Sequence, residues 1–134
     1  MNTPENTHAT LEKIRNEIVV KYPEIKLLML FGSRAREDER EDSDWDFGYV
    51  APKGFDESPL YTDLVLLLKT EKVDLVDLKR ASALLRFRAT QDGIAIFEKS
   101  GKEYVDFWLA AVHFWCDAGP IIRAEYDAIL EGLK

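Results

Sequence analysis

The spacing of apolar residues changes along the chain, and it predicts a series of short elements. Over residues 10–22 apolar side chains recur at helical intervals, and Pro23 ends the predicted helix. Residues 1–9 are predicted to be a loose polar lead before that helix. Residues 25–31 are short and mostly apolar and end at Gly32, which is typical of a buried strand.

Downstream of a polar, charged segment over 33–43, strand and helix patterns alternate. Within 44–50, aromatic residues alternate with Asp and Gly, so one strand has two faces of different character. The patterns predict strands over 44–50, 72–78 and 94–97, and helices over 58–69, 81–91 and 101–134, the last divided by Gly119-Pro120. This order indicates an α+β fold, a small mixed β-sheet with helices packed on it. We expect one domain over 1–134, with a core over about 10–100 and C-terminal helices over about 101–134.

Composition and charge narrow the classes of function. Hydrophobic residues make up 46% of the chain and charged residues 32%, a normal globular balance. The net charge, 18 − 25 = −7, disfavours direct binding of nucleic acid and favours small anionic substrates held by metal, or a basic protein partner. No apolar run approaches the roughly 20 residues of a membrane span, and the first residues lack signal-peptide features, so we expect a cytoplasmic protein.

Cys116 is the only cysteine, which excludes an internal disulfide and a cysteine zinc site. Its apolar neighbours Phe114 and Trp115 predict a packed thiol. No nearby basic residue would lower its pKa, so we expect no catalytic role.

Gly32-Ser33 directly follows the first predicted strand. Gly adopts backbone angles that other residues avoid and lets a phosphate approach the main chain. Ser33 adds a hydroxyl donor. The same dipeptide is also typical of an ordinary turn, so it carries no function alone.

Asp44-Trp45-Asp46 places two carboxylates on one face of a predicted strand, because residues i and i+2 point the same way. Two close carboxylates repel each other unless a cation lies between them, and Mg²⁺ prefers carboxylate and phosphate oxygens. An exposed polar strand face gives the same pattern, so this reading stays open here.

A third acid, Asp74, lies between Val73 and Leu75 in another strand, where it is costly unless paired or metal-bound. Three carboxylates on adjacent strands would hold two Mg²⁺ ions. The alternative is a strand-end acid that faces solvent. Asp77 is a rival third ligand, although a regular strand turns it to the opposite side, where it would cap the next helix.

Together these residues resemble a known signature. Gly32-Ser33, ten residues and then Asp44-x-Asp46 is similar to the signature of the DNA polymerase β-type nucleotidyltransferase superfamily. The fuller segments 32–36 and 43–46, with 73–78, resemble the minimal nucleotidyltransferase (MNT) subgroup, over about residues 10–100. One departure is Glu37, where the subgroup often has Gly, in an unusually acidic loop.

The resemblance implies a site and its ligands. Gly32 and Ser33 would hold the triphosphate of ATP, and Arg34 and Arg36 would contact phosphate. Three carboxylates would hold two Mg²⁺ ions: Asp44 and Asp46 would bind both ions, and Asp74 would complete one of the two sites.

Stand-alone MNT proteins of this size resemble the antitoxin of the HEPN/MNT toxin–antitoxin family. That resemblance implies transfer of AMP to a tyrosine of a HEPN ribonuclease toxin, which silences it, within a hetero-oligomeric complex. Two alternatives remain: a small-molecule adenylyltransferase like those acting on aminoglycosides, and a module that masks the toxin by binding alone.

Aromatic residues in the C-terminal region fit a protein partner. Tyr104, Trp108 and Trp115 share one helical ridge, which is predicted to be core. Phe107 and Phe114 form a neighbouring ridge that is a candidate interface.

Overall fold

A four-stranded mixed sheet forms the centre of the computed structural model, which describes residues 4–36, 43–117, 124 and 127–128. The strand order is β3-β2-β1-β4, with β1 antiparallel to both neighbours and β2 parallel to β3. The strands are β1 (Leu27–Phe31), β2 (Trp45–Val50), β3 (Val73–Asp77) and β4 (Ile94–Glu98). The predicted α+β fold with a small mixed sheet is confirmed.

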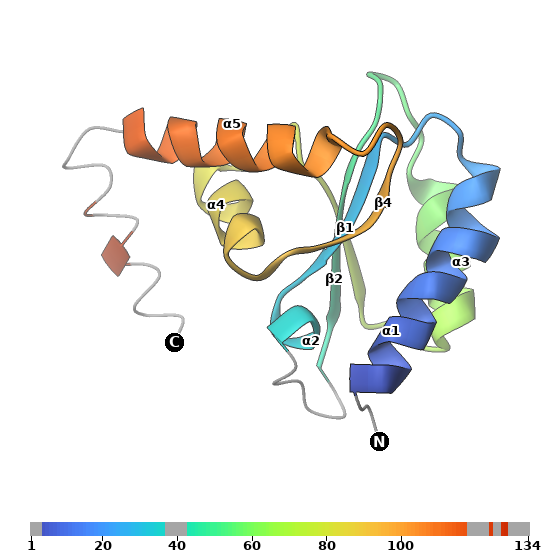
Figure 1. Ribbon diagram of the computed structural model, residues 1–134. Helices are drawn as coiled ribbons and strands as arrows, with labels where there is room; N and C mark the ends of the chain where they lie inside the picture. Colours follow the sequence, from blue (N-terminus) through green and yellow to red (C-terminus); the bar gives the residue numbers. More distant parts are fainter. Residues whose placement is uncertain (1–3, 37–42, 118–123, 125–126, 129–134) are drawn as a thin grey trace.

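Helices cover both faces of this sheet. The helices are α1 (Pro4–Lys13), α2 (Ser33–Arg36), α3 (Ser58–Leu68), α4 (Ala83–Asp92) and α5 (Glu103–Asp117). Figure 1 shows α1 and α3 on one side of the strands and α4 and α5 on the other. All five residues of β1 are buried between these layers, as its apolar run predicted.

The first helix begins earlier than its apolar pattern predicted. It starts at Pro4, and it continues through a π-helical turn (Ile14–Ile18) and a 3₁₀ turn (Val19–Lys21). Thr7 is buried at 7% exposure, so part of the expected polar lead packs against the protein. Pro suits the first turn of a helix, where its missing N–H costs nothing.

The remaining predicted elements are present within a few residues of the expected ends. α4 begins at Ala83, because the Ser82 hydroxyl oxygen accepts a hydrogen bond from the Leu85 N–H at 3.1 Å and caps the helix. The predicted break at Gly119-Pro120 and the acidic loop 37–42 lie outside the described residues. Within the described part of the chain, no helix is long and apolar enough to cross a membrane.

The buried face of α5 differs from the predicted ridge. Four residues with helical spacing, Tyr104, Phe107, Ala111 and Trp115, are buried or half-buried on the second face of the sheet and on α4. This face centres on Ala111, so the predicted core residue Trp108 lies at its edge and is 39% exposed. Phe107 is therefore part of the packing.

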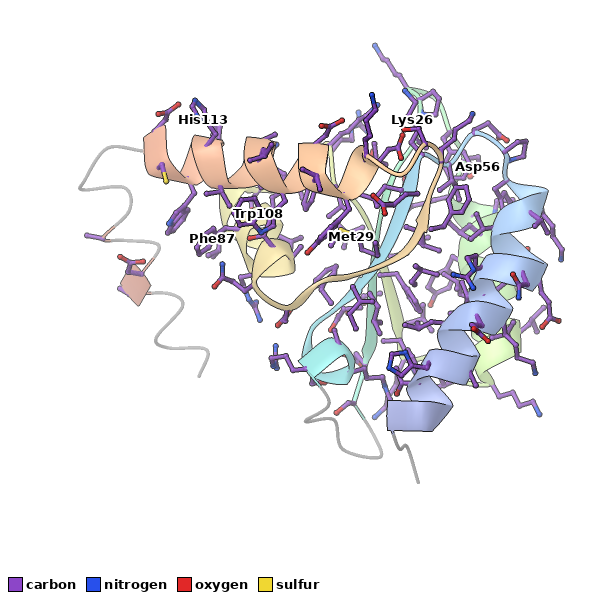
Figure 2. The ribbon with its side chains drawn as sticks, viewed as in Figure 1. Lys26, Met29, Asp56, Phe87, Trp108 and His113 are labelled. Carbon is purple, nitrogen blue, oxygen red and sulfur yellow. The ribbon has the colours of Figure 1, made fainter. Side chains whose placement is uncertain are left out.

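The layer beneath α5 contains Met29 of β1, which is fully buried (Figure 2). Phe87 of α4 stacks on Trp115, with ring centroids 4.5 Å apart. Phe114 and Cys116 are exposed, so the prediction of a packed thiol was wrong. Near Cys116 both the inward and the outward face of α5 carry apolar residues. Apolar neighbours in the sequence therefore did not reveal that Cys116 lies on the outward face.

Candidate active site

The chain turns sharply at Gly32, between the end of β1 and α2. Its φ of +80° is a left-handed angle that side chains other than Gly seldom adopt. A Cβ atom there would lie 2.3 Å from the Asp46 Oδ2 atom, so this carboxylate packs on the bare backbone. The N–H groups of Ala35 and Arg36 donate to the Gly32 carbonyl, each at 3.1 Å, and close the turn. Conformation and space both require glycine at this position.

The sheet brings the predicted carboxylates to one end. In the parallel pairing of β2 with β3, Asp46 lies directly opposite Asp74. In the antiparallel pairing of β1 with β2, Asp46 lies opposite Phe31, the residue before Gly32. Asp44 is exposed one residue before β2 begins. The three acidic residues and the glycine turn therefore lie at the same end of the sheet. Figure 1 shows α2 at this end of the strands.

The other face of β2 is apolar, as the alternation predicted. Trp45, Phe47 and Tyr49 are buried in the core cluster on the α1 and α3 side. The rings of Trp45 and Phe47 stack with centroids 6.1 Å apart. Packing of this face fixes the pleat of β2, and so directs Asp46 to the opposite side.

The electrostatic environment of Asp46 is unfavourable for its charged form. The pKa of Asp46 is raised to about 6, with burial as the largest cause and the negative charges of Asp74 and Asp44 next. A side-chain hydrogen bond with Asp74 acts in the same direction, whereas the positive charge of Arg88 lowers the pKa. Asp46 is thus close enough to both Asp74 and Asp44 for their negative charges to act on it.

This donor set fits a divalent cation that the protein holds only in part. Within the described ranges, no three Asp, Glu, His or Cys side chains converge closely enough to enclose a metal ion. Mg²⁺ does not need such a cage, since it commonly binds one or two carboxylates together with water and substrate phosphates. A cation at Asp46 would also relieve the repulsion that raises its pKa.

Arg34 is buried at 5% exposure, and its guanidinium group faces the protein. Its Nε and Nη2 atoms donate to the Ser43 carbonyl at 3.1 and 2.8 Å. Its guanidinium carbon lies 4.4 Å from the ring centroid of Trp45. These contacts fix the backbone just before Asp44, while the expected contact of Arg34 with phosphate stays a prediction.

Arg36 is also engaged with the protein. Its Nη1 atom lies 2.7 Å from the Asp92 Oδ2 atom. The other oxygen of Asp92, Oδ1, accepts a hydrogen bond from the Gly32 N–H at 3.2 Å. One carboxylate at the end of α4 thus connects the glycine turn to Arg36, and this link is absent from the sequence motif.

Comparison with known families decides what class of site this is. The sequence model of the family described as "Polymerase beta, Nucleotidyltransferase" matches residues 12–102, more than half of the chain. The chain belongs to this family. The match includes the glycine turn, all three carboxylates and α4.

A curated relative of this nucleotidyltransferase is the protein adenylyltransferase MntA of Aphanizomenon flos-aquae (strain 2012/KM1/D3). The two are 28% identical over 113 residues, which cover 75% of each chain.

Solved structures share the fold over nearly the whole nucleotidyltransferase chain. A crystal structure of a toxin–antitoxin with AMP-PNP matches at 25% identity and a TM-score of 0.64, covering 98% of both chains. A structure of a tri-AMPylated Shewanella oneidensis HEPN toxin in complex with MNT antitoxin matches at 23% identity and a TM-score of 0.66. That second match covers 95% of this chain and 98% of the other, and it supports the fold alone.

Two residues near the nucleotidyltransferase site were not singled out from the sequence. Asp92 ends α4, where the helix dipole disfavours an acid, and that unusual position was the one available signal. Arg88, one helical turn earlier, acts electrostatically on Asp46. Asp92 contacts Gly32 and Arg88 acts on Asp46, and the residues of each pair are more than 40 positions apart. No local sequence pattern reveals such contacts.

Asp77, the rival third carboxylate, lies away from this site. It pairs with Tyr49 across β2 and β3, three positions beyond Asp74 and on the other face of the sheet. Its Oδ1 atom accepts a hydrogen bond from the Lys79 N–H at 3.0 Å, so it caps the turn after β3. The geometry therefore favours Asp74 as the partner of Asp46.

Proposed function

We propose that this nucleotidyltransferase transfers AMP from ATP to a HEPN-type toxin protein, onto a tyrosine hydroxyl, and so neutralises the toxin. The observation that carries the chemistry is the register of the sheet, which sets Asp46 beside Asp74 and against Gly32. The adenylyltransferase relative and the shared fold with toxin–antitoxin structures support the choice of nucleotide and acceptor.

Asp44, Asp46 and Asp74 are the residues that would hold two Mg²⁺ ions. Ions bound there would lower the pKa of the attacking hydroxyl and would stabilise the charge of the leaving pyrophosphate. The acceptor oxygen forms a bond to the α-phosphorus, the bond from that phosphorus to the bridging oxygen breaks, and the hydroxyl proton goes to solvent.

The other residues of the site act by position. The left-handed turn at Gly32 presents main chain to the triphosphate, and the Ser33 hydroxyl donates to a phosphate oxygen. Arg34 holds Ser43 and so positions Asp44 at the start of β2. Arg36 and Asp92 hold the glycine turn against α4.

The outward face of α5 is the surface that we assign to the toxin. Its large apolar side chains Val105, Trp108, Leu109 and Phe114 are 39–55% exposed. We refer to these four residues as the outer stripe of α5 (Trp108 is labelled in Figure 2). Asp106 and Asp117 flank the stripe, which favours a partner with an apolar groove and basic rim.

Intact-mass spectrometry tests the transfer. A HEPN-type toxin co-expressed with this chain, then incubated with ATP and Mg²⁺, is expected to gain mass in whole AMP units. With the Asp44→Asn/Asp46→Asn double variant, the mass of the toxin is expected to stay unchanged. Both substitutions preserve the shape of the side chain and remove the charge that would bind metal. Transfer by the double variant would remove these residues from the site, and full neutralisation without transfer would favour masking by binding.

A matched pair of leucines tests the toxin surface. Leu109→Ser on α5 is expected to weaken toxin binding, measured by calorimetry, about tenfold or more. Leu66→Ser is the control, since Leu66 is 68% exposed on α3, on the opposite side of the sheet. Equal affinities for both variants would place the toxin elsewhere.

A further inference from the structure

Three arginines lie near the glycine turn and the carboxylates, and they differ in their partners. Arg34 donates to the Ser43 carbonyl and packs on Trp45, and Arg36 pairs with Asp92. Arg88 of α4 is half-buried, and among the residues described it forms neither a hydrogen bond nor an ion pair. A guanidinium group in this state retains its donors for a ligand.

The position of Arg88 is fixed by the helix that carries it. α4 is held at its start by the Ser82 cap and at its end by Asp92, whose Oδ1 atom accepts from the Gly32 N–H. Residues four apart on a helix share a face, about 5–6 Å apart at Cβ. Arg88 therefore lies on the same face as Asp92, one turn back from the glycine turn.

The charge of Arg88 reaches the carboxylates as well. The positive charge of Arg88 interacts with the Asp46 carboxylate, which the pairing of β2 with β3 sets opposite Asp74. At this end of the sheet a guanidinium group suits an anionic ligand, because charge-assisted hydrogen bonds to phosphate oxygens are strong.

Other cations on this side of the sheet are directed elsewhere. Lys79 donates from Nζ to the Ala51 carbonyl at 2.9 Å, at the opposite end of β2. The guanidinium carbon of Arg86 lies 5.2 Å from the ring centroid of Phe114 on α5. Neither reaches the end of the sheet that holds Gly32 and Asp46.

We propose that Arg88 contacts the triphosphate of the bound nucleotide and sets the preference of the site for ATP over AMP. The planar guanidinium group makes paired hydrogen bonds to phosphate oxygens, and AMP lacks the β- and γ-phosphates that it would contact. The proposal rests on the proposed function, because it takes ATP as the substrate.

The test is calorimetric binding of ATP and of AMP, each with Mg²⁺ and without toxin. Arg88→Ala is expected to weaken ATP binding about 10- to 100-fold and AMP binding less than about twofold. Arg88→Lys keeps the charge but loses the paired geometry, so an intermediate affinity for ATP is expected. Arg15→Ala, which removes the same charge from the far side of the molecule at 50% side-chain exposure, is expected to bind both nucleotides as the wild type does.

Two results would overturn the assignment. One is unchanged ATP affinity in Arg88→Ala, and the other is an equal loss for ATP and AMP, which indicates a structural effect. If Arg88→Ala does not fold, Arg88→Gln is measured in its place. If the wild type transfers AMP to toxin while Arg88→Ala binds ATP normally, only the role of Arg88 fails. If the wild type binds ATP no better than AMP, both proposals fail.

Discussion

At the scale of single residues, Gly32 and Asp46 determine each other. The left-handed turn at Gly32 is strained for any other residue, and the Asp46 carboxylate occupies the space of a Cβ atom. The motif predicted that Gly32 matters for phosphate. It did not reveal that the same glycine also makes room for the Asp46 carboxylate, because that contact crosses from one strand to another.

A glycine pair separates strain from contact. Gly32→Ala is expected to abolish AMP transfer. It is also expected to lower the free energy of unfolding by more than about 1–2 kcal/mol, which is the cost of left-handed strain alone. Gly101→Ala is the control, since Gly101 has a similar φ of +82° but nothing within 4 Å of its Cβ position. Urea unfolding and intact-mass assays of both variants measure this, and equal losses would contradict it.

The carboxylate cluster predicts a pH dependence of stability. The pKa of Asp46 is about 6 in the folded, metal-free protein, above the value of about 3.9 for an unfolded chain. Above pH 6 the folded state therefore bears the cost of the charge, and as the pH falls from 7 towards 4 that cost disappears. Asp46→Asn removes the cost at every pH.

With chelator present, Asp46→Asn is expected to be more stable than the wild type at pH 7.5, by about 1–2 kcal/mol. The difference is expected to vanish near pH 4. Urea unfolding at several pH values measures this difference. Asp106→Asn is the control for the loss of one acid, because Asp106 is exposed on α5. A variant less stable than the wild type at pH 7.5 would show that the carboxylates do not repel.

At the scale of elements, α4 connects the site to the rest of the fold. Its span was predicted as 81–91, within two residues of the observed Ala83–Asp92. Its contact with the glycine turn through Asp92 was not, because the two residues are 60 positions apart. Sequence patterns report which face of a helix is apolar, but they do not report which segment its polar end meets.

Removing that connection is expected to loosen the site. Asp92→Ala removes the acceptor of the Gly32 N–H and one partner of Arg36, and a loss of about 1–3 kcal/mol in unfolding free energy is expected. Asp117→Ala also removes the final acid of a helix, but its pair with His113 is largely exposed, so little change is expected. Thermal unfolding of both variants checks the difference, which equal midpoints would contradict.

At the scale of the whole molecule, the sequence predicted the class of fold, the strands and the carboxylate motif. These follow from local periodicity and from the spacing between Gly32 and Asp46. It misjudged α5, where Trp108 faces outward and Phe107 inward, because nearly every position of that helix is apolar or aromatic. A helix with two apolar faces gives no single direction until its neighbours are known.

Ligand binding is expected to stabilise the whole chain, because binding to the folded state alone shifts the unfolding equilibrium. ATP with Mg²⁺ is expected to raise the thermal midpoint, and ATP with excess chelator to raise it much less. The Asp44→Asn/Asp46→Asn variant is expected to lose the difference between the two conditions. An equal shift of the wild type with and without metal would contradict a metal-dependent site.

The proposed site forms only when β2 and β3 pair in the observed parallel register. A slip of one residue would turn Asp74 to the core face and bring Val73 or Leu75 to its place beside Asp46. A chain with that error would lack one carboxylate of the proposed site, and metal and substrate would bind it poorly. If ATP and Mg²⁺ bind as proposed, they therefore stabilise the correctly paired sheet relative to the slipped one.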